Sequence, residues 1–147
     1  MMPLPQDFKE FLKLLNKEEV EYLLIGGYAV AYYGYVRYTG DMDIFIRFSP
    51  QNAVRIRQVL IEFGFSESVL PQDLFAEKGS IIRMGVPPMR LEILNDISGV
   101  TFEECYDRRV LQSVDGVDIN FIHLEDLKQN KAASGRTKDL NDLEHLP

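Results

Sequence analysis

A short apolar run that ends at two adjacent glycines constrains the fold of this chain most. The run covers residues 22–25, which is long enough for a buried strand and too short for a helix of its own. Gly26 and Gly27 interrupt it, and residues 28–33, which are small or apolar and are followed by Gly34, have a pattern typical of a short helix. The sequence therefore predicts a strand, a glycine turn and a helix in immediate succession.

The remaining segments alternate between strand and helix patterns. Apolar periodicity and capping residues predict further helices over residues 6–17, 50–63 and 102–109 and over the last two dozen residues, with a break near Ser134. Runs rich in β-forming residues predict further strands over residues 43–48, 80–84, 89–94, 110–114 and 117–122. The turns 85–88 and 115–116 favour hairpins. The predicted fold class is α/β or α+β, a small mixed sheet with helices packed on it.

Composition limits the classes of protein that this chain can represent. Its 147 residues, 46% of them hydrophobic, predict a single domain over residues 1–147, with residues 1–5 as an extended arm. A net charge of −7 argues against a large interface with duplex nucleic acid. No apolar run reaches the roughly 20 residues of a membrane span, and the single cysteine, Cys105, cannot form an internal disulfide. We expect a cytoplasmic protein without a membrane partner.

Two acids separated by one residue stand at the start of the second predicted strand. Asp41 and Asp43 would project to the same face, about 6 to 7 Å apart at their Cα atoms. Carboxylates without histidine or cysteine at ligand spacing favour Mg²⁺ over zinc. Glu92, in a later strand between apolar neighbours, would complete the site. Two alternatives remain open: the acid pair is a solvated strand start, and Glu92 pairs with Arg90 on its own face.

Other motifs are absent or ambiguous. The glycines lack the spacing of a dinucleotide fingerprint or a P-loop, and His123 and His145 have no matching nucleophile pattern, which favours surface or capping roles. Near the C-terminus, Lys128 and Lys131 share one helix face. Arg136 and the residues after it follow a helix break, from which their side chains could reach into a cleft. A solvated, charged helix face is the competing interpretation.

Taken in order, these pieces resemble the polymerase-β-like nucleotidyltransferase superfamily. Its signature is a strand, a Gly-Gly or Gly-Ser turn, a short helix and an acid-x-acid pair, which residues 24–31 and 37–44 reproduce. The chain is most similar to small prokaryotic AbiEii-like and uncharacterised nucleotidyltransferase-like domains, in which Arg-x-Thr precedes the acids and Lys…Arg-x-Lys-Asp-x-x-Asp follows late in the chain. The residues that match this late motif are Lys131, Arg136, Lys138, Asp139 and Asp142.

The resemblance implies Mg²⁺-dependent transfer of a nucleoside monophosphate from an NTP to a protein or RNA acceptor, as in toxin-antitoxin or phage-defence pairs. Asp41 and Asp43 would hold two Mg²⁺ ions, with Glu92 joining one of them, and Gly26-Gly27 would seat the triphosphate. The implied phosphate-binding residues are Lys131 and Arg136, then Arg37 and Lys128, while Asp139 would orient Arg136 or Lys131 without touching the substrate.

Two departures from the family pattern bear on activity. Gly27 stands where the commoner small-domain motif has serine, and Glu92 stands where aspartate is more usual. An alternative therefore remains, a catalytically silent nucleotide-binding or protein-interaction module with the same fold. A plain structural role, in which the acids and bases only pair with one another, is a third. Specificity is expected from a partner protein, a homo-oligomer or the cleft itself.

Overall fold

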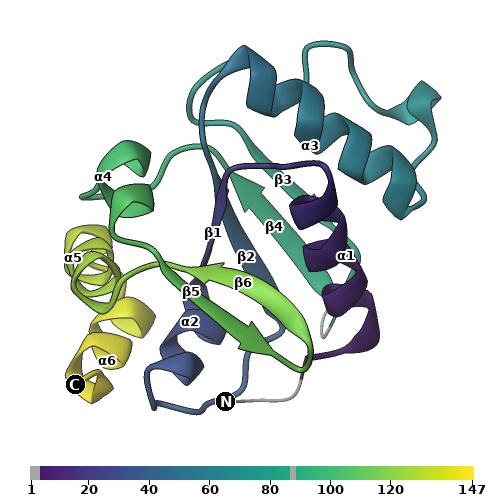
Figure 1. Ribbon diagram of the computed structural model, residues 1–147. Coiled ribbons are helices and arrows are strands. Elements are labelled where there is room, and N and C mark those ends of the chain that lie inside the picture. Colours follow the sequence, from purple (N-terminus) through teal and green to yellow (C-terminus); the bar gives the residue numbers. More distant parts are fainter. Residues whose placement is uncertain (1–3, 87–88) are drawn as a thin grey trace.

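A six-stranded mixed sheet organises the computed structural model, which describes residues 4–86 and 89–147 (Figure 1). The strands are β1 (Tyr22–Ile25), β2 (Asp41–Ile46), β3 (Ile81–Met84), β4 (Arg90–Leu94), β5 (Val110–Val114) and β6 (Val117–Phe121). The helices are α1 (Gln6–Lys17), α2 (Gly26–Tyr32), α3 (Pro50–Phe63), α4 (Phe102–Asp107), α5 (Leu124–Ser134) and α6 (Thr137–His145), with a 3₁₀ turn, η1 (Glu67–Val69). The mixed α/β architecture predicted from the sequence is confirmed.

The strand order is β3-β4-β2-β1-β6-β5. Both edges are antiparallel hairpins, β3–β4 and β5–β6, the pairs β2–β4 and β1–β6 are parallel, and the central pair β1–β2 is antiparallel. Between β2 and β4 the register places Asp41 beside Arg90 and Asp43 beside Glu92. Residues nearly fifty positions apart in the chain therefore become neighbours at the start of β2.

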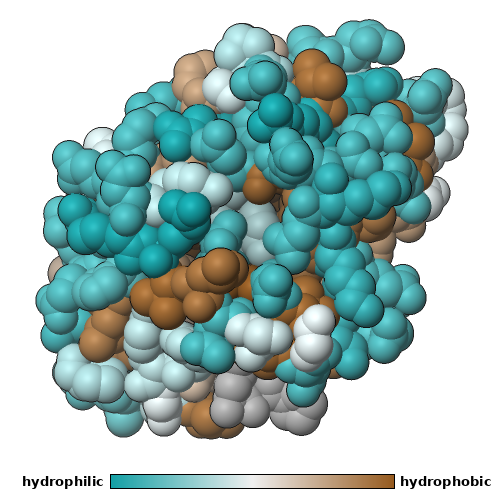
Figure 2. Space-filling view, viewed as in Figure 1, coloured by the Kyte–Doolittle hydropathy of each residue, from teal (hydrophilic) through white to brown (hydrophobic). Residues whose placement is uncertain are grey.

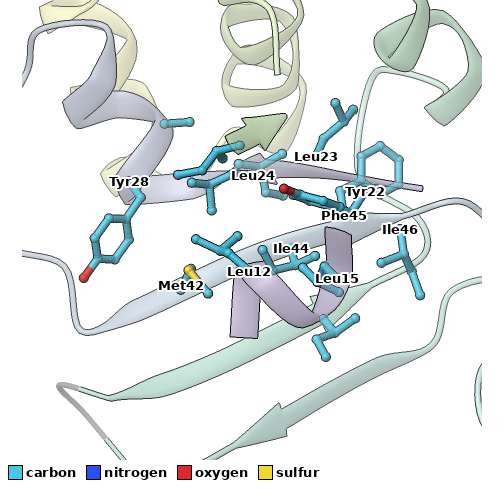
Figure 3. Close-up of a cluster of buried hydrophobic side chains, with 14 of the residues drawn as sticks. Leu12, Leu15, Tyr22, Leu23, Leu24, Tyr28, Met42, Ile44, Phe45 and Ile46 are labelled. Carbon is cyan, nitrogen blue, oxygen red and sulfur yellow. The ribbon is translucent and has the colours of Figure 1, made fainter. Parts of the chain in front are cut away.

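The first half of strand β2 has a buried side and an accessible side, whereas Phe45, which follows the two acids on their own face, is buried. Met42, Ile44 and Ile46 are fully buried, while Asp41 and Asp43 alternate with them and are only half-buried. Figure 3 shows the labelled core side chains of α1, β1 and β2 gathered into one cluster. Because successive strand residues point to opposite faces, an apolar core on one face leaves the two acids together on the other.

Helices α1 and α3 follow from patterns that were visible in the sequence. The residues of α1 that recur at helical spacing are all buried: Phe8, Phe11, Leu12 and Leu15. Helix α3 begins after Ser49, whose Oγ accepts a hydrogen bond from the backbone N–H of Asn52 at 3.1 Å. The side chain of Asn52 in turn bonds the backbone of Glu21 and Arg47, so the cap also fastens α3 to the start of β1 and the end of β2.

The structure differs from the sequence prediction at the glycine pair. Gly26 and Gly27 are not a turn between β1 and a later helix, because α2 itself begins at Gly26, two residues before the predicted start. The predicted hairpin joining β3 to β4 is present, although Pro87 and Pro88 of its turn lie outside the described residues. Of the expected extended arm, residues 1–3 also lie outside them, and Leu4 is buried.

Hydrophilic residues cover most of the face seen in Figure 2, and a smaller hydrophobic patch lies near the β5–β6 hairpin. Leu111 on β5 is one of the large apolar side chains that remain exposed. Within the described residues, none of the helices combines the length and the apolar character needed to cross a membrane.

Candidate active site

Three carboxylates converge where β2 and β4 run side by side. Asp41, Asp43 and Glu92 each offer one oxygen, and these three oxygens all lie within 4.8 Å of one another. The parallel register accounts for the convergence, because it sets Glu92 directly beside Asp43. The acids predicted from separate strands are thus brought together, and Glu92 points toward the pair despite its extra methylene.

Asp43 lies at the centre of this cluster and has the most perturbed ionisation. Burial, followed by the negative charges of Glu92 and Asp41, raises the pKa of the Asp43 carboxyl from its ordinary 3.8 to about 7, although Lys131 and Lys138 act in the opposite direction. The cluster offers three carboxylate oxygens, and the positive charges near Asp43 do not balance the negative charges beside it. Such a donor set suits a hard divalent cation such as Mg²⁺. The residues present therefore fit the metal that the resemblance implies.

Gly26 allows the Asp43 carboxylate to approach the backbone closely. A Cβ atom at position 26 would lie 2.0 Å from Asp43 Oδ2, so any side chain there would collide with the acid. The φ angle of Gly26 is +65°, which side chains other than glycine rarely adopt. Both observations require glycine at the junction of β1 and α2.

Gly27 is required for a different reason. A Cβ atom at this position would lie 2.6 Å from both Cβ and Oγ1 of Thr39. Thr39 therefore fills the space that the serine of the commoner motif would need. The Thr39 hydroxyl donates a hydrogen bond of 3.1 Å to the carbonyl oxygen of Asp41, which fixes the chain just before the first acid.

Two arginines pair with two of the three acids. The guanidinium of Arg90 donates from Nε to Asp41 Oδ1 and from Nη2 to Asp41 Oδ2, each at 2.9 Å. Arg83 on β3 donates from Nε to Glu92 Oε2 at 3.1 Å. Arg90 thus pairs with Asp41 rather than with Glu92, the partner considered from the sequence. Arg83 was not foreseen, because only the β3–β4 register places it beside Glu92.

Two acids of the cluster, Asp43 and Glu92, line a cleft of about 350 Å³ between the sheet and the helix pair α5–α6, and Asp41 lies outside its lining. The predicted site residues that line it are Gly26, Gly27, Arg37, Asp43, Glu92, Lys131, Arg136 and Asp139. Lining residues that the sequence analysis did not assign to the site include Lys138, Ser134, Asn130 and Asp96. Lys138 could have been assigned to the site from the sequence, because it stands inside the Arg-x-Lys-Asp motif. In the structure it lies close enough to Asp43 to affect the pKa of that carboxyl.

A network of ion pairs extends from the wall of the cleft into the protein interior. Lys131 Nζ lies 2.9 Å from Asp139 Oδ1 and 3.1 Å from Asp142 Oδ2, and all three residues are almost fully buried. Asp142 also accepts two hydrogen bonds of 2.6 Å from the guanidinium of Arg37. The network connects α5, α6 and the segment before β2.

Hydrogen bonding sets the charge of this network. Burial acts to raise the pKa of Asp139, but bonds from Lys131, Ser134 and Arg136 outweigh it and lower the pKa to about 2. The pKa of Asp142 is lowered as well, since bonds from Arg37 and Lys131 outweigh its burial. The prediction that Asp139 orients Lys131 and Arg136 has a geometric basis here. Lys131 itself is held at the cleft wall by two acids.

The outer bases differ in their access to the cleft. The Arg136 side chain is 77% exposed and keeps one bond, of 2.8 Å, to Asp139, so most of its donors stay available. Lys128 does not line the cleft. Its Nζ donates to the carbonyl oxygen of Pro147 at 2.9 Å and lies 3.8 Å from Glu125. The structure therefore brings Arg136 to the predicted site and leaves Lys128 outside it.

The histidines and the cysteine have structural surroundings. His123 caps α5, since its Nδ1 accepts a hydrogen bond from the backbone N–H of Glu125. The ring of His145 stacks on Tyr35 with centroids 4.2 Å apart. Cys105 is buried, and that burial raises the pKa of its thiol to about 12. Capping and packing roles for the histidines agree with the absence of a nucleophile pattern in the sequence.

Solved structures with the same fold carry nucleotidyltransferase names. A Thermotoga maritima protein assigned to the nucleotidyltransferases aligns with 94% of this chain and 88% of its own, at a TM-score of 0.62 and 17% identity. The lincosamide antibiotic adenylyltransferase LnuA, solved with lincomycin bound, aligns with 96% of this chain and 94% of its own, at a TM-score of 0.61 and 17% identity.

An antigenic nucleotidyltransferase-like protein from Paracoccidioides brasiliensis aligns with 97% of this chain and 77% of its own, at a TM-score of 0.57 and 18% identity. Proteins of curated function give no significant sequence match. Residues 5–147 match the model of a family described as nucleotidyl transferase of unknown function, DUF2204. With the fold and nearly the whole length in agreement, the chain belongs to this nucleotidyl transferase family.

Proposed function

We propose that this protein transfers a nucleoside monophosphate from an NTP to an acceptor hydroxyl, with Mg²⁺ at the acid cluster. The convergence of Asp41, Asp43 and Glu92 within 4.8 Å beside a cleft that also carries bases is the observation on which the proposal depends. The family of the chain and the adenylyltransferase LnuA among its structural neighbours support it.

The chemistry divides between the metal and the side chains of the cleft. When bound, the metal would lower the pKa of the acceptor hydroxyl and neutralise charge on the phosphates. The acceptor oxygen bonds to the α-phosphorus while the bond from that phosphorus to the bridging oxygen breaks. Pyrophosphate leaves with the negative charge, and the acceptor proton passes to solvent. Asp41, Asp43 and Glu92 would hold the metal.

The rest of the cleft binds and orients the triphosphate. Gly26 and Gly27 line it with backbone alone, so phosphate oxygens can approach closely. Arg136 and Lys138 also line the cleft and provide positive charge for the phosphates. Lys131, held by Asp139 and Asp142, presents its ammonium group in a fixed position. Arg37 acts mainly by fastening Asp142.

The acceptor in this proposal is a protein or an RNA end, used within a toxin-antitoxin or phage-defence pair. A net charge of −7 disfavours a broad grip on nucleic acid, so an RNA acceptor would be recognised at its end. LnuA was solved with lincomycin, a small molecule, and compounds with free hydroxyl groups are therefore included as competing acceptors in the test.

The test follows transfer of label from each α-labelled NTP, with Mg²⁺ or with EDTA. Acceptors are the protein itself, cell proteins, total RNA and a panel of hydroxylated small molecules. We expect Mg²⁺-dependent transfer by the wild type and a loss of at least a hundredfold in Asp41→Asn/Asp43→Asn. Asp118→Asn, which changes an exposed acid on β6, is the matched control and should retain full activity.

One observation favours the second candidate, a nucleotide-binding module without turnover. Arg90 and Arg83 already neutralise Asp41 and Glu92, so the cluster is stable without a catalytic metal. This alternative predicts that nucleotides raise the melting temperature while no label is transferred to any acceptor. Transfer that disappears with the acids would reject it, and indifference to every nucleotide would reject both candidates.

A further inference from the structure

We propose that Arg90 is a built-in cation at Asp41, so that the acid cluster takes one divalent ion instead of the two implied by the family resemblance. This inference rests on the proposed function, because it concerns the metal site of that function. It assigns a positioning role to a residue of this chain that neither the family description nor the resemblance mentions.

The geometry is that of a bidentate pair. Both carboxylate oxygens of Asp41 accept from the Arg90 guanidinium, at 2.9 Å each. Paired, parallel N–H···O bonds between arginine and carboxylate are stronger and more directional than a single ion pair. Each carboxylate oxygen keeps a further lone pair, so Asp41 can still contact an ion on the side of Asp43. Because the guanidinium contacts both oxygens of this carboxylate, a second ion at Asp41 would have to share them with Arg90 or displace it.

Both partners are anchored by the backbone. Asp41 and Arg90 are register neighbours on the parallel strands β2 and β4. The N–H of Arg90 donates to the carbonyl oxygen of Gly40, and the hydroxyl of Thr39 bonds the carbonyl oxygen of Asp41. The side chains of Arg90 and Asp41 are 35% and 23% exposed, so water screens the pair only partly. The pair is therefore a fixed part of the sheet.

The charge count leaves room for one dication. When Asp43 is ionised, the three carboxylates carry three negative charges, and Arg90 and Arg83 compensate two of them through ion pairs. The remaining charge is that of Asp43, for which the structure gives no ion pair within its described residues. One divalent ion beside Asp43 leaves the cluster with a single positive charge toward a triphosphate. A second ion at Asp41 would have to displace Arg90 or bind beside a guanidinium.

Arg83 provides the matched comparison. It pairs with Glu92 on the same face of the sheet, but through one bond of 3.1 Å, from an edge strand, with 57% of its side chain exposed. A single exposed bond leaves this side chain free to turn into solvent when an ion binds. Removing either arginine deletes one positive charge, and only Arg90 occupies a carboxylate with both donors.

The test counts Mn²⁺ ions on the chain. Metal-free protein is titrated with Mn²⁺ alone, and electron paramagnetic resonance measures the unbound ion. We expect one tight Mn²⁺ per chain in the wild type and in Arg83→Gln, and two in Arg90→Gln. Arg90→Lys keeps the charge at this position and should bind one ion. Melting temperatures are measured for every variant, and two ions in a folded Arg90→Lys, which keeps the charge, would overturn the inference even if Arg90→Gln fails to fold.

The inference would be overturned if the wild type bound two ions or none. It would also be overturned if a folded Arg90→Gln still bound one ion. The count does not depend on turnover. Label transfer by a wild type that binds two ions would leave the proposed function standing and reject only the role of Arg90. One ion in the wild type and two in Arg90→Gln, without transfer to any acceptor, would support Arg90 and reject the catalytic proposal.

Discussion

Gly26 is the residue at which backbone conformation and the acid cluster depend on each other most directly. We predict that Gly26→Ala abolishes Mn²⁺ binding, because the new Cβ would lie 2.0 Å from Asp43 Oδ2 and must displace the carboxylate. The φ angle of +65° adds a cost of about 1 to 2 kcal/mol for any side chain. Mn²⁺ titration and urea unfolding measure the two effects separately.

The control for this variant is Gly116→Ala. Gly116 has a φ angle of +80° in the β5–β6 turn, and a Cβ atom there would meet nothing within 4 Å. This variant should lose stability of a similar size through the backbone alone and bind Mn²⁺ normally. Normal Mn²⁺ binding by a folded Gly26→Ala would contradict the role assigned to the close approach.

The raised pKa of Asp43 predicts a pH-dependent stability of the metal-free protein. The folded protein holds the Asp43 proton up to a pKa of about 7, whereas the unfolded chain releases it near 3.8. Between these values the folded state binds more protons, so stability falls as the pH rises from about 4 to about 7. The loss is at most about 4 kcal/mol, at 1.36 kcal/mol per pKa unit.

Urea unfolding in EDTA, at pH values from 4.5 to 8, measures this dependence against Asp43→Asn. Subtracting the profile of the variant removes the contributions of other titrating groups. We expect the wild type to lose stability relative to Asp43→Asn across this range. Parallel profiles would show that the carboxyl titrates at an ordinary pKa.

A residue of the site could be predicted from the sequence where the residues next to it in the chain form a recognisable motif. Asp41, Asp43, Gly26 and Gly27 belong to short local patterns and were found from them. Arg90 was noticed with the wrong partner, because its pairing with Asp41 depends on the register between β2 and β4, which no local pattern encodes.

At the scale of elements, the pairing of α5 with α6 depends on a buried lysine. We predict that Lys131→Met destabilises the protein by about 3 to 5 kcal/mol, because it leaves Asp139 and Asp142 buried without their shared cation. Lys128→Met is the control on the same helix, since Lys128 pairs only with an exposed acid and a terminal carbonyl. Its stability should change by less than about 1 kcal/mol. Chemical denaturation measures both.

A loss as small in Lys131→Met as in Lys128→Met would contradict the buried network. The activity of Lys131→Met is interpretable only where the variant is shown to be folded. A folded Lys131→Met/Asp139→Asn variant, in which one acid is removed together with the lysine, should recover part of the stability. The activity of this folded double variant then separates the structural role of Lys131 from any contact that Lys131 makes with phosphate.

The elements themselves followed closely from the sequence, since periodicity and caps report on local structure. The start of α2 did not follow from the sequence, because two adjacent glycines are typical of a turn. Only the surrounding structure makes them the first residues of the helix. The strand order also could not be read, because the parallel pairs β2–β4 and β1–β6 join segments that are distant in the chain. The cleft depends on that order.

At the scale of the whole molecule, the site holds part of the acid content of the chain but not its net charge of −7. The acid cluster contributes three negative charges, and the buried network adds Asp139 and Asp142. Bases pair with most of these acids, so the excess of acid in the composition does not translate into a repulsive cleft. A small chain can in this way combine acidic composition with the proposed site for a polyanionic substrate.

The single domain expected over the chain predicts that the site and the rest of the sheet unfold together. A central sheet whose edges are both hairpins, with one continuous core, leaves no boundary at which a part could melt alone.

Mn²⁺ at a hundred times its dissociation constant should stabilise the folded state by about 2.7 kcal/mol. The melting temperature would then rise by roughly 5 to 10 °C. Calorimetry should show one transition that moves as a whole, and Asp118→Asn should respond as the wild type does. Two transitions, of which only one shifts with the metal, would contradict this expectation. They would show that the part of the chain without the metal site unfolds separately.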